Sequence, residues 1–276
     1  MQAEGIIAGT ISPDILEKGH QTIRFAADGF SVIISDASFR PVHLESFTTT
    51  SLPASAQASE CLRVLEEMGL PDFSGESSIL LDTDAAAIIP SALFDETSTA
   101  YLLSKIRPLN AEDSTDSRYV RSRELHVIQA IPQAILEMKD KMKGEVQILH
   151  VLECMLSLAD QIKASDHQRG FLLAEVQQHS LSLLAIKEDR AILLNRFALN
   201  EPGDFIYHIL NAMRQLGMER EGIPVYLSGI VHEEHELHGL LRKYIRNVRL
   251  TPYYLETLSR KDISRFMLLS EASKCV

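Results

Sequence analysis

The sequence predicts an α/β protein in which one unit, a three-stranded meander followed by a helix and a further strand, occurs twice. Two observations carry this prediction. Apolar runs with strand and helix spacing occur in the same order in both halves of the chain. Landmark residues also pair between the copies, Phe47 with Phe197 and Gly69 with Gly217. A composition of 45% hydrophobic and 24% charged residues excludes collagen-like, coiled-coil and wholly disordered classes.

The first copy begins with three predicted strands, over residues 22–27, 30–35 and 42–47. Asp28-Gly29 between the first two predicts a tight hairpin, because both central residues of such a turn take positive φ. A helix follows and ends at Gly69. Its apolar face carries Leu62, Leu65 and Met68. A short buried strand over 78–81 completes the copy.

The second copy repeats this order with predicted strands over 171–176, 181–186 and 191–197. A helix over 204–216 carries an apolar stripe and ends at Gly217, and 225–227 is again a short strand. The recurrence of the whole order predicts an internal duplication of β-β-β-α-β-α units.

A different pattern lies between the copies. Residues 125–131 and 146–150 have the apolar character of buried strands, and each is followed by a helical stripe. Strand–helix–strand–helix at this spacing predicts parallel extensions of a sheet. Residues 107–123 are polar and rich in helix breakers, which predicts a loop.

These patterns predict a first domain over residues 1–165, a second over 166–256 and a C-terminal tail over 257–276. The first domain includes the polar loop 107–123 and a connecting helix over 151–163. The tail mixes basic with apolar residues at helical spacing. It either docks on a partner or packs on its own domains, and the second is favoured because unanchored tails stay disordered.

Lys plus Arg number 27 and Asp plus Glu 38, so the formal net charge is −11. Binding to nucleic acid or anionic membranes through bulk charge is therefore not expected. The sequence has neither a secretory signal nor a run of roughly 18 apolar residues that would span a membrane. The three cysteines have no disulfide or zinc spacing. We expect a soluble cytoplasmic protein without an integral membrane segment.

A meander followed by helices and parallel strands, occurring twice, resembles the paired ribonuclease-H-like domains of the actin, sugar-kinase and Hsp70 superfamily. The segment around Ala130-Ile131-Pro132 and Gly144 resembles the region before the second domain in those proteins. In size and helix layout, the chain is similar to the actin-like proteins of type IV pilus assembly. It is more similar still to a small family of uncharacterised bacterial proteins with an actin-like ATPase fold. The runs that carry this resemblance are Asp28-Gly29-Phe30-Ser31, Ile89-Pro90 to Leu93-Phe94-Asp95, and Asp204-Phe205.

The resemblance implies a nucleotide cleft in which each domain contributes a hairpin turn of the form Asp-x-Gly-Ser/Thr. Glycine lets backbone N–H groups approach phosphate oxygens, and the Asp holds Mg²⁺ through water. The first turn here carries Asp28, Gly29 and Ser31, but Asp and Gly are adjacent. Phe30 is expected to occupy the space of a phosphate.

The second hairpin and the adenosine element depart from the family pattern as well. In the second hairpin Glu175 stands in for the Asp, no glycine follows, and Gln177 crowds the loop. The adenosine element retains Gly229 and has Ile230 in place of a second glycine. Because phosphoryl transfer depends on positioning and charge, such partial motifs are expected to leave a vestigial cleft.

Two other groups of side chains contain potential catalytic or metal-binding residues. The stretch from His232 to His238 is rich in His and Glu but lacks the His-Glu-x-x-His spacing of zinc proteases, so a polar helix start is favoured over a metal site. Asp82 and Asp84 alternate as a carboxylate pair would. They lie between two apolar runs, where a turn is the favoured interpretation.

The leading hypothesis is therefore a pseudo-ATPase, an actin-like scaffold without catalytic residues or a cofactor. It would act through an unidentified protein partner or through self-association. The alternative is a working ATP-binding or ATP-hydrolysing protein that takes Mg-ATP through Asp28, Glu175 and Gly229. A third hypothesis is a small-molecule sensor that uses the cleft between the domains without phosphate contacts.

Overall fold

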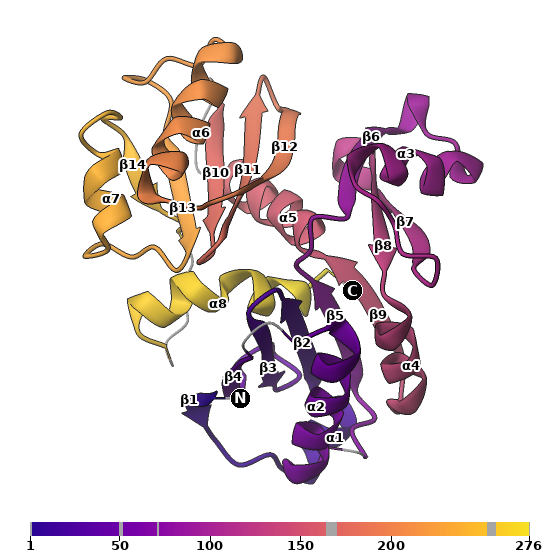
Figure 1. The fold of residues 1–276 in the computed structure, drawn as a ribbon. Helices are drawn as coiled ribbons and strands as arrows, with labels where there is room; N and C mark the ends of the chain where they lie inside the picture. Colours follow the sequence, from indigo (N-terminus) through magenta and orange to yellow (C-terminus); the bar gives the residue numbers. More distant parts are fainter. Residues whose placement is uncertain (1, 50–51, 71, 164–169, 253–257, 276) are drawn as a thin grey trace. The chain divides into compact units, whose positions relative to one another are not determined.

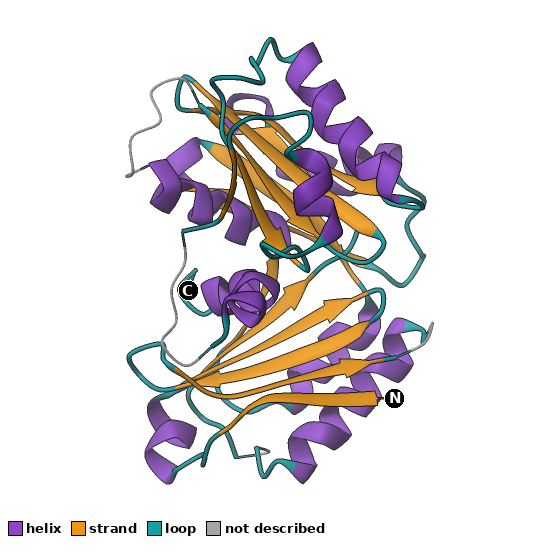
Figure 2. Cartoon of the chain, turned by 90° about the vertical axis from the view of Figure 1, so that its left-hand side faces the viewer, coloured by secondary structure: helices purple, strands orange, loops and turns teal. Residues whose placement is uncertain are grey.

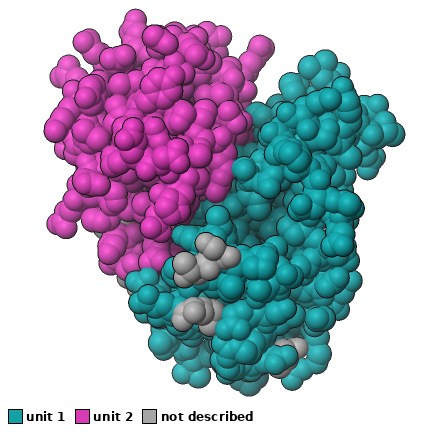
Figure 3. All heavy atoms as spheres, in the orientation of Figure 1, with its two compact units in different colours: residues 1–154, 269–276 teal, residues 155–268 magenta. Residues whose placement is uncertain are grey.

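The computed structural model describes residues 2–49, 52–70, 72–163, 170–252 and 258–275. The chain forms two compact units, and we describe each by itself. Unit 1 comprises residues 1–154 with 269–276, and unit 2 comprises residues 155–268 (Figure 3). The domain boundaries expected near residues 165 and 257 lie outside the described residues.

Unit 1 is built on a six-stranded sheet. In order across the sheet, its strands are β1 (Gln2–Ala8), β4 (Pro41–Thr48), β3 (Gly29–Ser35), β2 (His20–Ala26), β5 (Glu76–Leu81) and β9 (Val146–His150). Strands β1 to β4 pair antiparallel, whereas β5 and β9 add in parallel. The predicted meander and the parallel extension by 146–150 are confirmed. Strand β1 was not predicted.

Three helices cover one face of this sheet (Figures 1 and 2). They are α1 (Pro13–Lys18), α2 (Ala54–Glu67) and α4 (Gln133–Lys141). Cys61, Val64 and Leu65 of α2 pack against strand residues such as Ile23 and Ile79, all of them buried. Burial of this apolar stripe is the main favourable term that holds helix and sheet together.

A separate three-stranded antiparallel sheet in unit 1 corrects two predictions. Its order is β6 (Ala86–Pro90), β8 (Leu125–Ile131) and β7 (Ser114–Val120), and α3 (Thr99–Ile106) packs against it. Short 3₁₀ turns occur at Ser91–Leu93, Glu96–Ser98 and Arg121–Arg123. The predicted loop over 107–123 is wrong for Ser114–Val120, where pairing with β8 orders a polar edge strand. The predicted parallel extension by 125–131 is wrong as well, because both neighbours of β8 run antiparallel to it.

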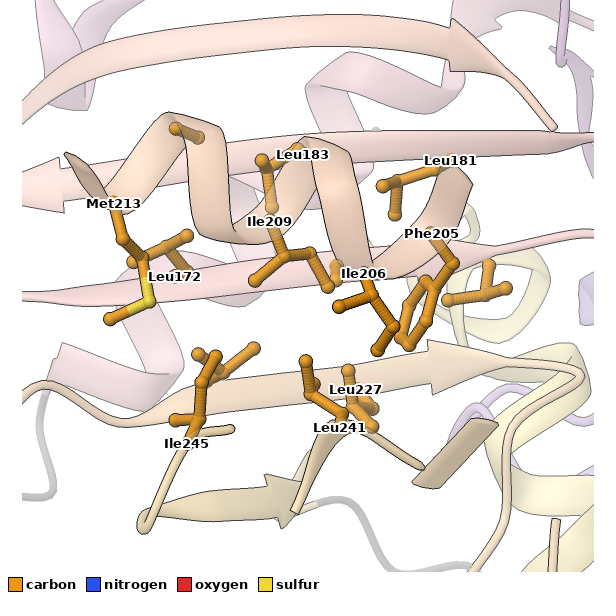
Figure 4. Packing of buried hydrophobic residues seen from close by; sticks show 14 of the residues in the cluster. Leu172, Leu181, Leu183, Phe205, Ile206, Ile209, Met213, Leu227, Leu241 and Ile245 are labelled. Atoms are coloured by element: carbon orange, nitrogen blue, oxygen red, sulfur yellow. The ribbon is translucent and has the colours of Figure 1, made fainter. Parts of the chain in front are cut away.

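Unit 2 repeats the central five-stranded arrangement. Its order is β12 (Arg190–Ala198), β11 (Ser180–Lys187), β10 (Phe171–Val176), β13 (Val225–Gly229) and β14 (Val248–Leu250). Helix α6 (Pro202–Gln215) lays Phe205, Ile209 and Met213 on β10 and β11 (Figure 4). Helix α7 (Glu236–Leu241) adds Leu241 to the same core.

Two helices contain residues of both units. Helix α5 (Val151–Lys163) begins in unit 1 and continues into unit 2, and α8 (Arg260–Ala272) begins in unit 2 and ends in unit 1. Phe266, Met267 and Leu269 of α8 are at most 4% exposed. The described part of the predicted tail is therefore buried within the protein itself.

The same backbone hydrogen bonds occur at matching positions in the two units. Thr49 N donates to Asp28 O over 2.8 Å, and Leu199 N donates to His179 O over 2.9 Å. Where the parallel strands end, Asp82 N donates to Phe25 O in unit 1 and Ile230 N donates to Val176 O in unit 2. With this alignment, Phe47 corresponds to Phe197 by register, as the sequence predicts.

The first hairpin differs in detail from the prediction. Ala26 pairs with Gly29, so Ala27 and Asp28 form the turn and Gly29 begins β3. Gly29 has φ +149°, and a Cβ there would lie 1.9 Å from the carbonyl oxygen of Phe47. The glycine therefore allows β4 to approach closely.

Gly229 and Gly69 provide a matched pair of substitutions. Gly229 has φ +83°, and a Cβ would lie 1.9 Å from Val176 O, whereas Gly69 has φ +72° and open space around it. Gly69→Ala should lower the free energy of unfolding by about 1–2 kcal/mol, the cost of a left-handed L-residue. Gly229→Ala should cost more, because strands β10 and β13 must also move apart. Urea unfolding checks this order, and equal losses would contradict the close approach.

Candidate functional site

In unit 2 a buried polar cluster lies at the carboxyl ends of the two parallel strands β10 and β13. Glu175 is 2% exposed, and Ser228 lies beside it on the neighbouring strand. Ser228 Oγ donates to Glu175 Oε2 over 2.5 Å, and Gln177 Nε2 donates to Glu175 Oε1 over 2.6 Å. Both carboxylate oxygens thus accept hydrogen bonds from side chains of the same unit.

In unit 1 the register position that corresponds to Glu175 is occupied by Arg24. Arg24 pairs with Ser31 on β3 as Glu175 pairs with Ser182 on β11. Arg24 forms a buried ion pair with Asp82, in which Nε donates to Oδ2 over 3.1 Å and a terminal nitrogen contacts the same oxygen. The carboxyl ends of β2 and β5 therefore carry a neutralised pair of charges.

The turn interpretation of Asp82 and Asp84 is wrong for Asp82. Its side chain is 1% exposed and contacts Arg24, because a guanidinium buried in the sheet needs a counter-charge. Asp84 is exposed and forms an ion pair with Arg107.

The predicted residues of the first turn lie together, but their side chains point to different places. Asp28 is exposed in the turn, and Gly29 is buried. Ser31 Oγ lies 3.0 Å from Ser46 Oγ on β4. Phe30 was expected to occupy the space of a phosphate beside the turn, but its ring points into the core instead. It is 2% exposed and stacks on Phe47 in the core, with ring centroids 4.8 Å apart.

The predicted residues of unit 2 are also neighbours. Val176, next to Glu175, pairs with Gly229, and Gln177 contacts Glu175 directly. Gln178 and His179 occupy the tip of the second hairpin, between Gln177 and Ser180, whose backbones are joined by a 2.8 Å hydrogen bond. The structure thus brings Glu175, Gln177 and Gly229 together, whereas Asp28, Gly29 and Ser31 share only the first hairpin.

Sequence reasoning missed a second polar network in unit 1, at the start of α5. Glu153 Oε1 accepts from the backbone N of His150 over 2.9 Å, and Oε2 lies 2.9 Å from Arg118 Nε on β7. His150 Nε2 lies 3.1 Å from Thr83 O. The Glu three residues after His150 resembles the acid of a helix capping box, a signal that the sequence did contain. Its ion pair with a strand 35 residues earlier had no such signal.

Burial raises the pKa of Glu153 to about 7, although the His150 backbone N–H and Arg118 both act to lower it. Glu153 as a whole is 8% exposed, so its charged carboxylate loses most of its hydration.

The His-rich stretch before α7 acts as a helix start. His235 Nδ1 accepts from Leu237 N over 3.2 Å, and His238 Nδ1 lies 3.0 Å from Glu233 O. Burial lowers the pKa of His235. In the part of the chain that the structure describes, no three His, Cys, Asp or Glu side chains are grouped as metal ligands.

Arg24→Met should lower the free energy of unfolding by about 3–5 kcal/mol, because it leaves Asp82 buried without its counter-charge. Asp82→Leu should do the same, and the double variant should recover most of the loss. The exposed pair Lys18–Asp14 is a matched control, since Lys18→Met should leave the free energy of unfolding nearly unchanged. Additive losses in a double-mutant cycle would show that the pair does not interact.

Glu153 should make stability depend on pH. Its pKa is about 7 when folded and near 4.5 when unfolded, so the folded state binds more protons between these values. The free energy of unfolding should therefore fall as pH rises from 4.5 to about 7. The loss should reach at most about 3 kcal/mol.

Urea unfolding across this pH range measures the effect. Glu153→Gln should remove this contribution, whereas Glu137→Gln on the exposed side of α4 should leave the pH profile unchanged. Parallel pH profiles for wild type and Glu153→Gln would contradict the assignment.

Solved structures share this fold. A Bacteroides thetaiotaomicron VPI-5482 protein described as having an actin-like ATPase fold and unknown function matches with a TM-score of 0.82 and 18% identity, over 97% of this chain and 100% of that one. A PilM-PilN type IV pilus biogenesis complex matches with a TM-score of 0.58 and 16% identity, over 95% and 98%. The ethanolamine utilization protein EutJ from Carboxydothermus hydrogenoformans matches with a TM-score of 0.53 and 6% identity, over 97% and 92%.

At these identities the likeness establishes the fold alone, and the predicted two-domain actin-like fold is confirmed. No curated protein matches the sequence. Among the described residues, no helix has the length and apolar character needed to cross a membrane. A model of a family described as a protein of unknown function, DUF3822, matches residues 8–248. The chain is therefore a member of the DUF3822 family, with an actin-like ATPase fold.

Proposed function

We propose that this protein is a non-catalytic member of the actin-like fold and acts as a protein-interaction scaffold. One observation carries the proposal. At the carboxyl ends of the central strands, where this fold would need exposed acids and glycines for Mg²⁺ and phosphate, the polar groups contact one another. Arg24 is paired with Asp82, and Glu175 accepts from Ser228 and Gln177.

The charges at these positions are unsuited to phosphoryl transfer. Such transfer is driven by positioning and by stabilisation of charge on the phosphate, with Mg²⁺ held by a carboxylate or its bound water. In unit 1, the place of a metal-binding acid is taken by a cation, Arg24. Asp82 is committed to that cation and is 1% exposed at its side chain.

The two hairpins give further support. A phosphate-binding turn presents several backbone N–H groups to one anion, which requires glycine conformations. The second hairpin has Gln178 and His179 at this place. In the first, the unusual backbone of Gly29 is explained by the carbonyl of Phe47 rather than by space for a ligand.

An interaction role is also consistent with the PilM-PilN type IV pilus biogenesis complex, a structure of the same fold. One observation favours the alternative, an ATP-binding protein that takes Mg-ATP. Glu175 is an acid at the carboxyl end of a central strand, in the second of the two places where such a protein would hold a metal.

A thermal-unfolding experiment separates these functions. The midpoint should stay unchanged on adding millimolar Mg-ATP or Mg-ADP, relative to Mg²⁺ alone. A ligand present at about a hundred times its dissociation constant adds roughly 2.7 kcal/mol of stability, which raises the midpoint by several degrees. A rise of this size that Glu175→Gln abolishes would contradict the scaffold proposal.

A further inference from the structure

Strand β12 forms one edge of the unit 2 sheet and has no strand on its outer side among the described residues. The corresponding strand of unit 1, β4, has its outer side covered by β1 (Figure 1). Both sheets otherwise have the same strand order. Among the described residues, the corresponding edge is therefore covered by a strand in unit 1 and by none in unit 2.

The two edges match residue by residue. The register of β3 with β4 shifts between Ile34 and Ser35, and that of β11 with β12 shifts between Ala185 and Ile186. When the two units are aligned on the matching hydrogen bonds of Thr49 and Leu199, the two register shifts fall at equivalent positions. The bulge does not prevent strand pairing beside it, because β1 pairs with β4 as far as His43 and Gly9 N then donates to Val42 O.

The open edge exposes apolar surface. Ile192 on β12 is 39% exposed, and Tyr207 on the adjoining helix α6 is 61% exposed. His208 connects the helix to the edge strand, since its ring stacks on Phe197 at 4.3 Å and meets Tyr207 at 5.3 Å. An exposed edge strand with apolar side chains is a template for pairing with another chain.

On β12 one backbone N–H makes a local hydrogen bond to a side chain. Arg196 N donates to the side-chain oxygen of its neighbour Asn195 over 2.9 Å rather than to β11. Asn195 is exposed, so this local hydrogen bond can be exchanged for one to an incoming strand. A local hydrogen bond from a backbone N–H to an Asn side chain competes with strand pairing.

We propose that the outer edge of β12 is a strand-addition site for an extended segment of a partner protein. The chemistry of the segment follows from β1. On β4, Glu4 pairs with Ser46 and Ala3 with Phe47, and the matching residues on β12 are Arg196 and Phe197. The segment thus places an acidic side chain opposite Arg196 and a small apolar one opposite Phe197. This inference rests on the proposed interaction function and names the site and the class of partner.

The probe is a fluorescent peptide with the β1 sequence, Gln-Ala-Glu-Gly-Ile-Ile-Ala, added to the full chain. Fluorescence anisotropy should show saturable binding. Asn195→Ala should tighten it, because the Arg196 N–H loses its competing acceptor. Arg196→Pro should weaken it at least about tenfold, because proline removes that N–H while an edge position tolerates it.

A charge exchange tests the register. Arg196→Glu should weaken binding about fivefold, and a peptide with Lys in place of its Glu should restore it, as expected for directly opposed charges. Arg190→Glu on the same strand is the matched control and should leave binding unchanged. A peptide with proline at alternate positions should not bind.

Each outcome bears on the proposal. The proposal is overturned if the peptide shows no saturable binding to either wild type or Asn195→Ala. It is also overturned if the peptide binds but neither Arg196→Pro nor the charge exchange alters the binding. Concentration-dependent self-association that Arg196→Pro abolishes assigns the edge to a second copy and overturns the partner assignment. A peptide failure with no nucleotide shift leaves the scaffold function intact, whereas a nucleotide shift contradicts the scaffold whatever the peptide does.

Discussion

The buried ion pair between Arg24 and Asp82 is the interaction that determines the charge at the carboxyl ends of the parallel strands in unit 1. A guanidinium inside a sheet is tolerated only when an anion lies against it, and Asp82, directly after β5, supplies that anion to Arg24, near the end of β2. The pair joins two parallel strands at the edge where open α/β sheets ordinarily bind ligands. The same contact that stabilises this edge removes its free carboxylate.

The two units show how one backbone can carry opposite charges at the same position. The strand order, the hairpin hydrogen bonds and even the bulges correspond, yet the central strand carries Arg24 near its end in one unit and Glu175 in the other. Both groups are buried and satisfied by neighbours, Arg24 by an acid and Glu175 by a hydroxyl and an amide. Matching backbone geometry in the two units thus accommodates different side chains near the strand ends.

Much of this fold could be predicted because its signals are local. The strands 125–131, 146–150 and 171–176 have the predicted bounds, since each is a continuous apolar run closed by a turn or helix. Strand β7 could not be predicted, because its polar side chains are ordered only by pairing with β8. The same holds for the site. The contact of Glu175 with Gln177 could be predicted because the two residues are neighbours in the sequence. The ion pair of Arg24 with Asp82 could not, because it forms only where two distant strands meet.

The path of the chain has a consequence for the order in which the units form during synthesis. Unit 2 is one continuous stretch, residues 155–268, whereas unit 1 is completed only by residues 269–276. Leu269 and Ala272 of that returning segment are fully buried. A ribosome makes a chain from its N-terminus at about 5–20 residues per second, and domains generally fold as they emerge. The unit that is translated first is therefore the last to acquire its full set of contacts.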